Sequence, residues 1–329
     1  MDDGVILVNE EALSESFIPD QILHREGQVK EIARSLAPAL QNRGINNIFV
    51  IGSTGVGKTL VVKWILEEQF KGNSVYINCW YCRTTHKILE EILLQLHIPV
   101  HGKESTEELI KKLQKYVKRK VIVCLDEVDQ LKEPEILYTL ARKEIGIVMI
   151  SNHSFMSWDL DSRVKSSLLL KEIEFRPYSH QELFSILKDR IGFALRPTSI
   201  SDDLLRTVSV IAKGDARVGL LTLKAAARNA QEKRLLLITI EEVKHAIKGA
   251  KILRLSYLLK KLNQHQRVIY EILKKKVRMA SGRLYEEYSK VASEPVVDRA
   301  YRNYMKRMIE LGLVRVEGSG RWKKYEIVA

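Results

Sequence analysis

Cysteine is scarce in this chain, and long apolar runs are missing altogether. The 329 residues include three cysteines, an odd number that does not suggest a disulfide framework. No apolar stretch approaches the length that spans a membrane, and the acidic start Met1-Asp2-Asp3 is unlike a secretory signal. The sequence holds no internal repeat and no low-complexity tract. We therefore expect a cytoplasmic protein without a membrane partner, in which a hydrophobic content of 45% supplies cores for two or three domains.

Two of the cysteines have the spacing of a redox motif. Cys79 and Cys82 stand in Cys-Trp-Tyr-Cys, directly after a short apolar strand at residues 75–77. A zinc site would need a second pair of ligands, and the sequence offers none. We therefore interpret these cysteines as structural residues.

The most specific motif is Gly-Ser-Thr-Gly-Val-Gly-Lys-Thr at residues 52–59, which fits the phosphate-binding pattern G-x-x-x-x-G-K-[ST]. An apolar strand at 48–51 precedes it, and a helix with one buried face follows at 60–70. Backbone N–H groups of such a loop surround phosphate oxygens, and the helix N-terminus adds partial positive charge. Lys58 would reach the β- and γ-phosphates, and the Thr59 hydroxyl would ligate Mg²⁺. The residues assigned to nucleotide binding are Gly52, Ser53, Thr54, Gly55, Val56, Gly57, Lys58, Thr59 and Leu60.

An acidic pair follows a second buried strand. Residues 121–125 form an apolar run rich in β-branched residues, and the run ends in Asp126 and Glu127. Open α/β sheets bind ligands at the carboxyl ends of their strands, so Asp126 would hold the Mg²⁺ shell and Glu127 would orient or activate the attacking water. The alternative is a solvated acidic turn, because Asp129 and Glu133 follow closely.

A third apolar strand, at residues 146–150, ends in Ser151 and Asn152. A polar side chain at this strand end would point at the γ-phosphate and the water. Strands commonly end in serine or asparagine, so this pattern alone is weak evidence for a catalytic residue.

The positive charge of the chain is concentrated at its C-terminal end. The whole chain carries 54 Lys and Arg against 41 Asp and Glu, a net charge of +13. Residues 251–329 hold 19 basic and 8 acidic side chains, a net +11, which leaves +2 for residues 1–250. This asymmetry indicates a basic module that faces a polyanion. Charge alone does not separate this interpretation from a solvated basic face.

The local pattern of the basic module favours a winged helix-turn-helix. Three amphipathic helices come first, and two strands with a glycine-rich turn between them follow. In that fold the last helix reads the major groove of DNA, and the tip of the hairpin reaches the adjacent backbone or minor groove. Winged helices also dock proteins, so the fold alone does not prove DNA binding. The expected helices are 263–276, 282–291 and 294–311, with Ser293 as the N-cap of the third, and the expected strands are 313–316 and 322–328.

The third helix of this module has one apolar and one polar side. Its apolar side is expected to carry Val297, Tyr301, Tyr304, Met305 and Met308. The polar side carries residues that would contact DNA, and the hairpin tip adds further basic side chains. We assign DNA binding to Arg299, Arg302, Asn303, Lys306, Arg321 and Lys323.

Residues 176–250 have helical patterns throughout. Ser201-Asp202-Asp203 suits a helix N-terminus, because a capping hydroxyl and acidic side chains are stabilising there. An α/β nucleotide domain followed by a small helical bundle resembles the layout of AAA+ ATPases, whose bundle closes over the nucleotide as a lid. The predicted fold is α/β: a flexible acidic tail at 1–16, a P-loop AAA+ parallel-sheet domain at 17–175, a helical lid domain at 176–250 and a C-terminal winged helix-turn-helix domain at 251–329.

The order of the motifs resembles the archaeal origin-recognition/cell-division-control initiators, AAA+ proteins that mark replication origins. Phe17 to Glu26 resembles the family's leading segment, which packs on the adenine. The pair Asn78-Cys79, with Thr84, Thr85 and the helix 88–96, resembles its initiator-specific insertion. The stretch 162–168 with 175–178 is similar to the stretch that holds its arginine finger, and Gly214-Asp215-Ala216-Arg217 is similar to its sensor-2 helix. The resemblance covers about residues 17–329.

The resemblance implies roles for further residues. Arg217 would contact the γ-phosphate, so ATP and ADP would favour different lid angles. Asn152 would be the sensor-1 residue. Arg163 would be an arginine finger offered to the ATP of a neighbouring molecule, a role for which Lys165 and Arg176 compete. The other implied contacts are Ile22, Leu23, Arg25 and Tyr178 to the nucleotide, and Arg83 and Lys87 to DNA.

The resemblance implies an ATP-dependent initiator that binds duplex DNA at a replication origin, in the cytoplasm and on the nucleoid. ATP or ADP and Mg²⁺ are the implied ligands, with Thr59 and Asp126 at the metal. Hydrolysis would be slow in a monomer, which lacks the neighbour's arginine. Other initiator molecules on DNA and a replicative helicase are the implied partners. The residues implied in catalysis are Glu127, Asn152, Arg163 and Arg217.

Three other functions stay open at this point. A branch-migration motor is also an AAA+ protein with a C-terminal winged helix, although the Asn78-Cys79 insertion disfavours it. The second alternative is a signalling or regulatory NTPase whose winged helix docks a protein. The third is a transcription regulator with a vestigial nucleotide site.

Overall fold

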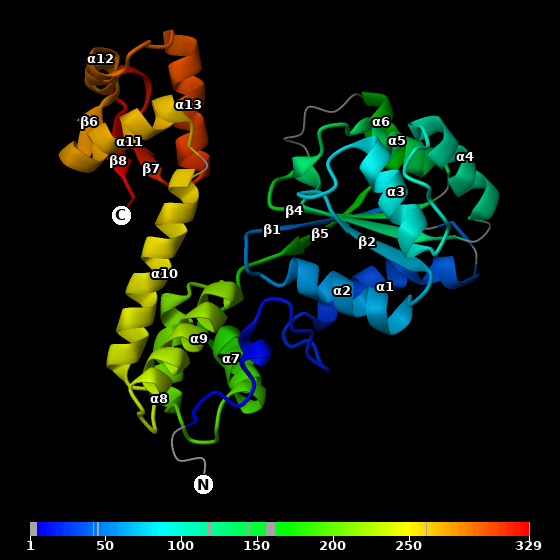
Figure 1. The fold of residues 1–329 in the computed structure, drawn as a ribbon, viewed down its shortest axis with the longest axis horizontal. Helices are drawn as coiled ribbons and strands as arrows, with labels where there is room; N and C mark the ends of the chain where they lie inside the picture. Colours follow the sequence, from blue (N-terminus) through cyan, green and yellow to red (C-terminus); the bar gives the residue numbers. More distant parts are fainter. Residues whose placement is uncertain are drawn as a thin grey trace. The chain divides into compact units, whose positions relative to one another are not determined.

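Two units make up the chain, residues 1–246 and residues 247–329 (Figure 1). The structure is a computed structural model, and it describes residues 5–41, 43–44, 46–117, 120–143, 145–155, 162–260 and 262–328. Within these ranges, the side chains outside the description are those of residues 162–164, 250–254, 257, 260 and 321.

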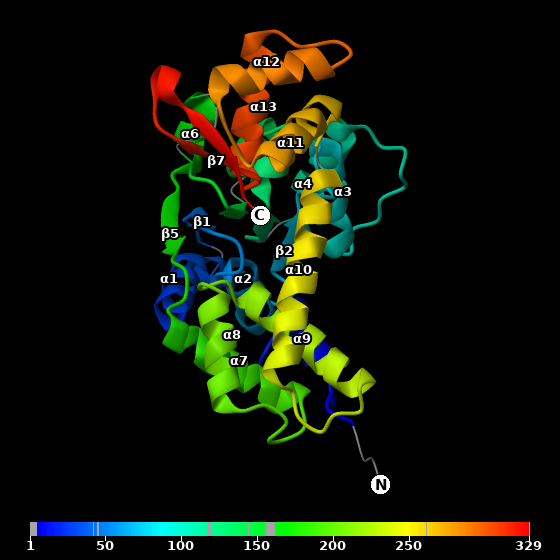
Figure 2. The ribbon, with the colours of Figure 1, turned by 90° about the vertical axis from the view of Figure 1, so that its left-hand side faces the viewer.

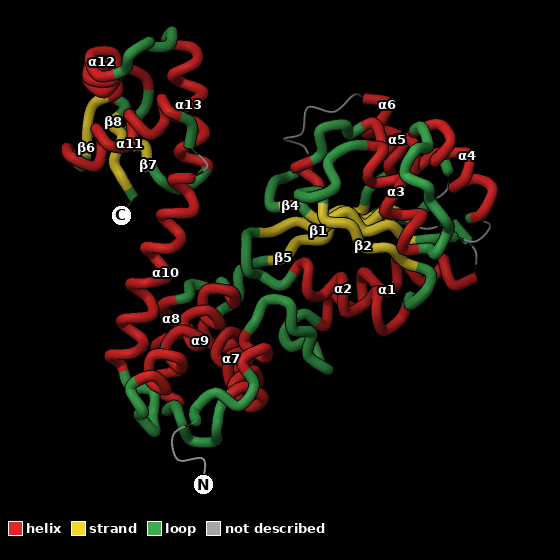
Figure 3. The backbone as a smooth tube through the Cα atoms, viewed as in Figure 1, coloured by secondary structure: helices red, strands yellow, loops and turns green. Residues whose placement is uncertain are grey.

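In the described part of the first unit, five strands form a parallel sheet (Figure 3). The strand order is β2-β3-β4-β1-β5, and each neighbouring pair is parallel. β3 and β4 are buried along their whole length, which explains their uninterrupted apolar sequences. The strands are β1 (Ile48–Gly52), β2 (Ser74–Asn78), β3 (Ile122–Asp126), β4 (Gly146–Ser151) and β5 (Lys171–Phe175).

Helices cover both faces of this sheet (Figure 3). On one face, α1 and α2 pack against apolar side chains of β1, β4 and β5. On the other face, α3, α4 and α5 pack against the opposite side chains of the same sheet, and α6 adds Leu168. This doubly covered parallel sheet confirms the predicted α/β class. The helices are α1 (Glu26–Leu36), α2 (Lys58–Gln69), α3 (Thr85–Gln95), α4 (Thr106–Tyr116), α5 (Glu135–Arg142) and α6 (Ser162–Leu168).

The edge strand β5 is absent from the sequence prediction. Its exposed residues Lys171, Glu172 and Glu174 are charged, and only Ile173 and Phe175 are buried. Charged side chains protect an edge strand from pairing with other chains. The same charges weaken the apolar pattern by which a strand is recognised, so this strand escaped prediction.

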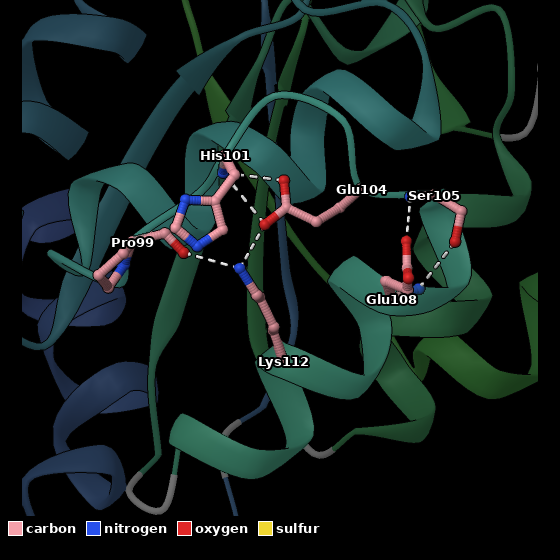
Figure 4. A network of polar contacts seen from close by, with 6 residues as sticks. All are labelled: Pro99, His101, Glu104, Ser105, Glu108 and Lys112. Carbon is pink, nitrogen blue, oxygen red and sulfur yellow. Dashed lines mark hydrogen bonds and ion pairs between the residues drawn. The ribbon is translucent and has the colours of Figure 1, made fainter.

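A network of polar contacts holds the loop between α3 and α4 (Figure 4). The Lys112 ammonium donates to the Pro99 carbonyl at 2.9 Å and is ion-paired with Glu104. The Glu104 carboxylate also accepts from the backbone N–H of His101. The contacts with Lys112 and His101 lower the pKa of Glu104 to about 2. Figure 4 draws these residues together with the capping box of α4: Pro99, His101, Glu104, Ser105, Glu108 and Lys112.

The cysteines are part of the core. All three are free thiols, and Cys79 and Cys124 are buried. Cys79 packs in the core between the sheet and α3, and burial raises the pKa of its thiol. The structural interpretation of Cys79 is therefore confirmed.

A helical lid follows β5 in the first unit. Figure 1 and Figure 2 both show α7 (His180–Ala194), α8 (Asp202–Ile211) and α9 (Ala216–Glu232) packed together. The Ser201 hydroxyl accepts the backbone N–H of Leu204, as expected of the predicted N-cap of α8.

The last lid helix, α10 (Ile240–Lys260), continues past residue 250, where the lid domain was expected to end. No glycine or proline in residues 251–260 stops it. It therefore begins in the first unit and ends in the second. None of the described helices combines the length and the apolar character that crossing a membrane requires.

The N-terminal strap, as we call residues 5–17, packs on the lid. Ile6 and Leu13 are fully buried, and the buried Arg190 of α7 donates to three strap carbonyls. The prediction of a flexible acidic tail at 1–16 is therefore wrong for residues 5–16. It failed because the few apolar residues of the strap follow neither a helical nor a strand period.

After the end of α10, the described part of the second unit contains three α-helices and a small antiparallel sheet. Its strands pair in the order β6-β8-β7. The predicted helices and the predicted hairpin are present, and β6 adds a short third strand. The elements are α11 (Gln264–Lys276), β6 (Arg278–Ala280), α12 (Ser281–Val291), α13 (Asp298–Glu310), β7 (Val314–Glu317) and β8 (Lys324–Ile327).

Helix α13 begins later than predicted, at Asp298. Its N-cap is Val297 and not Ser293, and the Val297 side chain is 73% exposed instead of lying on the apolar side. The backbone of Val296 is bonded to two tyrosine hydroxyls of α12, which hold the preceding loop outside the helix. These contacts come from another element, so the local pattern placed the helix start too early.

Candidate nucleotide-binding site

Neighbouring strands deliver the predicted site residues to one edge of the sheet. β1 ends at Gly52, β3 at Asp126 and β4 at Ser151, and the strand registers keep these ends level. Parallel strands present their carboxyl ends at the same edge, which is where open α/β sheets bind ligands. The structure therefore brings together the phosphate loop (residues 52–59), Asp126 and Asn152.

Two glycines of the phosphate loop have backbones that other residues rarely adopt. Gly55 has φ 72° and Gly57 has φ 91°, both in the left-handed region. Gly57 is also the N-cap of α2, so the loop leads directly into the helix N-terminus. This geometry turns backbone N–H groups and the positive end of the helix toward one space, as phosphate binding requires.

Lys58 is buried, and three oxygens hold its ammonium group. Nζ donates to the carbonyls of Gly52 at 2.8 Å and Ser53 at 2.7 Å, and to Asn152 Oδ1 at 2.9 Å. Burial lowers the pKa of Lys58 to about 8; the Asp126 carboxylate opposes this shift and the Arg217 guanidinium adds to it. The Lys58 ammonium group therefore lies at the phosphate loop, where phosphate oxygens would take the place of these three acceptors.

The Asp126 carboxylate is buried and accepts three hydrogen bonds. The Thr59 hydroxyl donates to Oδ2 at 2.7 Å, and the Tyr76 hydroxyl donates to the same oxygen at 2.6 Å. The backbone N–H of Glu127 donates to Oδ1 at 2.8 Å. Sequence analysis missed Tyr76, because the local sequence of an apolar strand does not show which strand will pair with it. Here the neighbouring strand is β3, which carries Asp126. Tyr76 holds the predicted metal ligand in place from β2.

The acidic turn after β3 is part of the site. Glu127 has a left-handed backbone, with φ 51° and ψ 43°, a costly conformation that clusters at functional sites. Asp129 accepts from the Ser151 hydroxyl at 3.0 Å and so ties this turn to β4. The alternative of a solvated acidic turn is wrong, because Asp126 is only 4% exposed and Asp129 is bonded to the neighbouring strand.

The lid touches the phosphate loop at the start of α9. The N–H of Ala216 donates to the Gly55 carbonyl at 2.9 Å, and the Asp215 carboxylate lies against Gly55. A Cβ at Gly55 would stand 1.8 Å from Asp215 Oδ1, and a Cβ at Gly57 would stand 2.6 Å from the Tyr178 hydroxyl. Both loop glycines are therefore required by close approach to the lid as well as by their backbone angles.

Arg217, the predicted sensor-2 residue, follows this contact point directly. Its positive charge contributes to the lowered pKa of Lys58. Its Nε is ion-paired with Glu15 of the N-terminal strap, at 2.9 Å from Oε2. Glu15 is a residue of this site that sequence analysis missed, because the strap was predicted to be a flexible tail.

The leading segment reaches the site through Arg25. This buried side chain donates to the Val56 carbonyl at 3.2 Å and the Arg176 carbonyl at 2.6 Å. Its guanidinium also lies over the Tyr178 ring, 3.8 Å from the centroid. Ile22 and Val56 are buried in the same core, whereas Leu23 and Leu60 are half-buried. Arg25 thus joins the segment, the phosphate loop and the lid.

The remaining predicted residues lie elsewhere. Arg83 stacks on Trp80 and donates to its carbonyl, and Lys87 is exposed in the first turn of α3. The side chains of Arg163 and Arg321 lie outside the described part of the structure. In the second unit, the exposed predicted DNA contacts are Arg299, Arg302, Asn303, Lys306 and Lys323.

The donor set fits a nucleotide with Mg²⁺. Thr59 and Asp126 place a hydroxyl and a carboxylate side by side, and hard oxygen donors of this kind suit Mg²⁺. Lys58 and the N-terminus of α2 would supply positive charge for the phosphates, and Arg217 follows the lid residues that contact the phosphate loop. The same site could hold ATP or ADP.

The pKa of Lys58 predicts a pH dependence of nucleotide binding. Phosphate binding needs the charged ammonium, which the free protein loses as the pH rises through about 8. We expect nucleotide affinity to be constant below this pH and to fall by about tenfold per pH unit above it. Titration of a fluorescent ADP analogue between pH 6.5 and 9.5 measures this. A Lys58→Arg variant, which stays charged, should give a flat profile; the same slope in both proteins would contradict the assignment.

Tyr76→Phe tests the support of Asp126. Loss of one hydrogen bond to a charged acceptor should cost about 1.5–3 kcal/mol of folding free energy and leave the carboxylate less well held. We expect a higher Mg²⁺ concentration for half-maximal nucleotide binding, with metal-free binding unchanged. Isothermal titration at several Mg²⁺ concentrations checks this, with Tyr116→Phe, an exposed tyrosine, as the control. An unaltered Mg²⁺ dependence would remove Tyr76 from the site.

Comparison with known proteins gives consistent matches. Residues 41–156 match the family described as AAA domain, and residues 184–248 match the Cdc6 AAA+ ATPase-type lid domain. The ORC1-type DNA replication protein 1 of Sulfurisphaera tokodaii is 32% identical, over 97% of this chain and 88% of that protein. The Aeropyrum pernix ORC1 protein, solved in complex with DNA, is 28% identical with a TM-score of 0.80, over 98% of this chain and 93% of that chain. Cdc6p from Pyrobaculum aerophilum shares the fold, with 24% identity, a TM-score of 0.69, and coverage of 98% and 94%.

These matches cover the site described above. The AAA domain match includes the phosphate loop, Asp126 and Asn152, and the lid match includes Arg217. The resemblance drawn from the motifs is confirmed. With 32% identity over nearly the whole of both sequences, this chain belongs to the ORC1-type DNA replication proteins, which are AAA+ ATPases.

Proposed function

We propose that this chain is an ATP-dependent initiator that binds duplex DNA at replication origins and changes its grip on DNA with its nucleotide state. The observation that carries the proposal is the contact of the lid with the phosphate loop, at Ala216 and Gly55. This contact supports a position of Arg217, on α9, at the nucleotide site, and α10, the next helix, continues into the second unit. The relative solved in complex with DNA supports DNA binding.

Each residue at the carboxyl edge of the sheet is proposed to have its own role in ATP hydrolysis. Mg²⁺, when bound, supplies positive charge that neutralises the phosphates. Lys58 would hold the β- and γ-phosphates, and Thr59 and Asp126 would hold the cation. Glu127 would orient the attacking water, and Asn152, already bonded to Lys58, would orient the γ-phosphate and that water. Arg163 is proposed to act on the ATP of a neighbouring molecule, so a monomer would turn over slowly.

The lid would carry the nucleotide state to the DNA-binding part. α9 touches the phosphate loop, and α10 continues without a break from the lid into the second unit. A lid that moves when Arg217 engages the γ-phosphate would therefore move the start of the second unit. A continuous helix is suited to this, because its backbone hydrogen bonds make it stiff.

The second unit is proposed to be a winged helix that grips DNA. Its three helices and hairpin have the order of that fold, and the polar side of α13 is exposed. Contacts with phosphates would supply most of the affinity, and one or two side chains on α13 would supply selectivity. Arg83 and Lys87 of the first unit are proposed as a second DNA contact. Other initiator molecules and the replicative helicase are the proposed partners on the nucleoid.

Lys58→Ala should abolish nucleotide binding and leave much of the DNA binding intact. The phosphate loop loses its only buried ammonium among the described residues, whereas the basic face of α13 is unaltered. Filter retention of labelled ATP and DNA-binding isotherms measure the two effects. Lys71→Ala, an exposed lysine after α2, is the control. Retention of ATP at the wild-type level by the Lys58 variant would contradict the assignment.

Mapping the wild type and the Lys58→Ala variant on their own genome would show whether occupancy is confined to an origin.

Arg299→Ala and Lys323→Ala test the proposed DNA-binding face. Each should weaken binding to all duplexes and reduce the slope of log affinity against log salt concentration by about one. A salt titration with a duplex of fixed length measures this slope. Lys274→Ala, on α11, removes a charge from the same unit outside that face and should change the slope less. Slopes equal to that of the wild type, with a protein partner recovered instead, would favour the docking function.

A further inference from the structure

The N-terminal strap runs along one side of the lid helix α9. The Gln231 side chain accepts the backbone N–H groups of Ile6 and Leu7 at one end. Glu10 is ion-paired with Lys224 and Arg228 in the middle, and Glu15 is ion-paired with Arg217 at the other end. The helix residues are spaced seven, four and three apart, which puts them on one side of α9. The strap and the helix are therefore antiparallel and matched in charge.

The position of Glu15 is set by contacts on both sides of it. The buried Arg190 of α7 donates to the carbonyl of Ser14 at 2.7 Å and to that of Phe17 at 3.2 Å. Arg190 also lies over the Phe17 ring, 4.6 Å from the centroid. Leu13, just before these residues, is fully buried. Glu15 is thus presented to Arg217 by a fixed segment of backbone.

Arg217 has two possible anionic partners. Its neighbours Asp215 and Ala216 contact the phosphate loop, and its charge acts on Lys58. Glu15 occupies Nε of the guanidinium, and a phosphate that binds this edge of the fork with two parallel hydrogen bonds must displace the carboxylate. The side chains of Arg217 and Glu15 are 51% and 44% exposed, so their ion pair is weak enough to be exchanged.

We infer that Glu15 competes with the γ-phosphate of ATP for Arg217 and thereby sets the preference of this chain between ATP and ADP. The inference rests on the role proposed for Arg217 above. ATP that engages Arg217 must break its pair with Glu15, whereas ADP leaves the pair intact. Glu15 therefore weakens ATP binding without affecting ADP binding. It makes the strap a specificity-determining part of the nucleotide site.

Equilibrium binding of fluorescent nucleotides tests this inference on the full chain. The dissociation constants of a non-hydrolysable ATP analogue and of an ADP analogue are measured for the wild type and for Glu15→Gln, at fixed Mg²⁺. Glu15→Gln keeps the shape of the side chain and removes its charge. We expect the affinity for the ATP analogue to rise about two- to fivefold, the range for an exchangeable exposed ion pair. The affinity for ADP should stay the same.

Two further variants separate this effect from a general loosening of the strap. Glu10→Gln weakens the strap at Lys224 and Arg228, away from Arg217, and should leave the ratio of ATP to ADP affinity unaltered. In an Arg217→Ala background, Glu15→Gln should have no effect on either nucleotide. Thermal unfolding confirms that each variant is folded.

The outcomes distinguish this inference from the proposed function. If the wild type binds neither nucleotide, the proposed function itself fails. If it binds both and Glu15→Gln leaves the ratio unchanged, the competition is disproved. A ratio that shifts equally in Glu10→Gln, or that shifts without Arg217, would also overturn it.

Discussion

The close contact between the lid and the phosphate loop is the constraint on which the rest of the site depends. The Gly55 carbonyl accepts the N–H of Ala216, and the Asp215 carboxylate fills the space where any larger residue at position 55 would put its Cβ. Because backbone meets backbone, small displacements of α9 are transmitted to the loop that would hold the phosphates. The same contact fixes the backbone next to Arg217, and so limits which groups its side chain can reach.

The site also buries two ionisable side chains, Asp126 and Lys58. Asp126 accepts three hydrogen bonds and Lys58 donates three, so each ion has polar partners away from water. Burial still lowers the pKa of Lys58, because these partners replace hydration only in part. A ligand that brings phosphate and a divalent cation would supply the opposite charges directly. This is a physical reason for nucleotide and Mg²⁺ to bind together here.

The lid is connected to two further parts of the chain, the N-terminal strap and the second unit. Residues 5–17 bind one side of α9 through Arg217, Lys224 and Arg228. α10 leaves the same lid toward the basic module. One small bundle is therefore joined to the phosphate loop, to an acidic segment and to the proposed DNA-gripping part. The proposed coupling of nucleotide state to DNA binding depends on this arrangement.

The sequence by itself determined the features that lie within one short window. The phosphate loop, the buried strands β3 and β4, the cap of α8 and the basic surplus of residues 251–329 were all readable, because spacing and composition act locally. Tertiary structure decided what depends on a partner from elsewhere: the charged edge strand β5, the bond from Tyr76 to Asp126 and the late start of α13. It also placed Glu15 on Arg217, because burial of Ile6 and Leu13 and the donors of Arg190 order the strap only when the lid is folded.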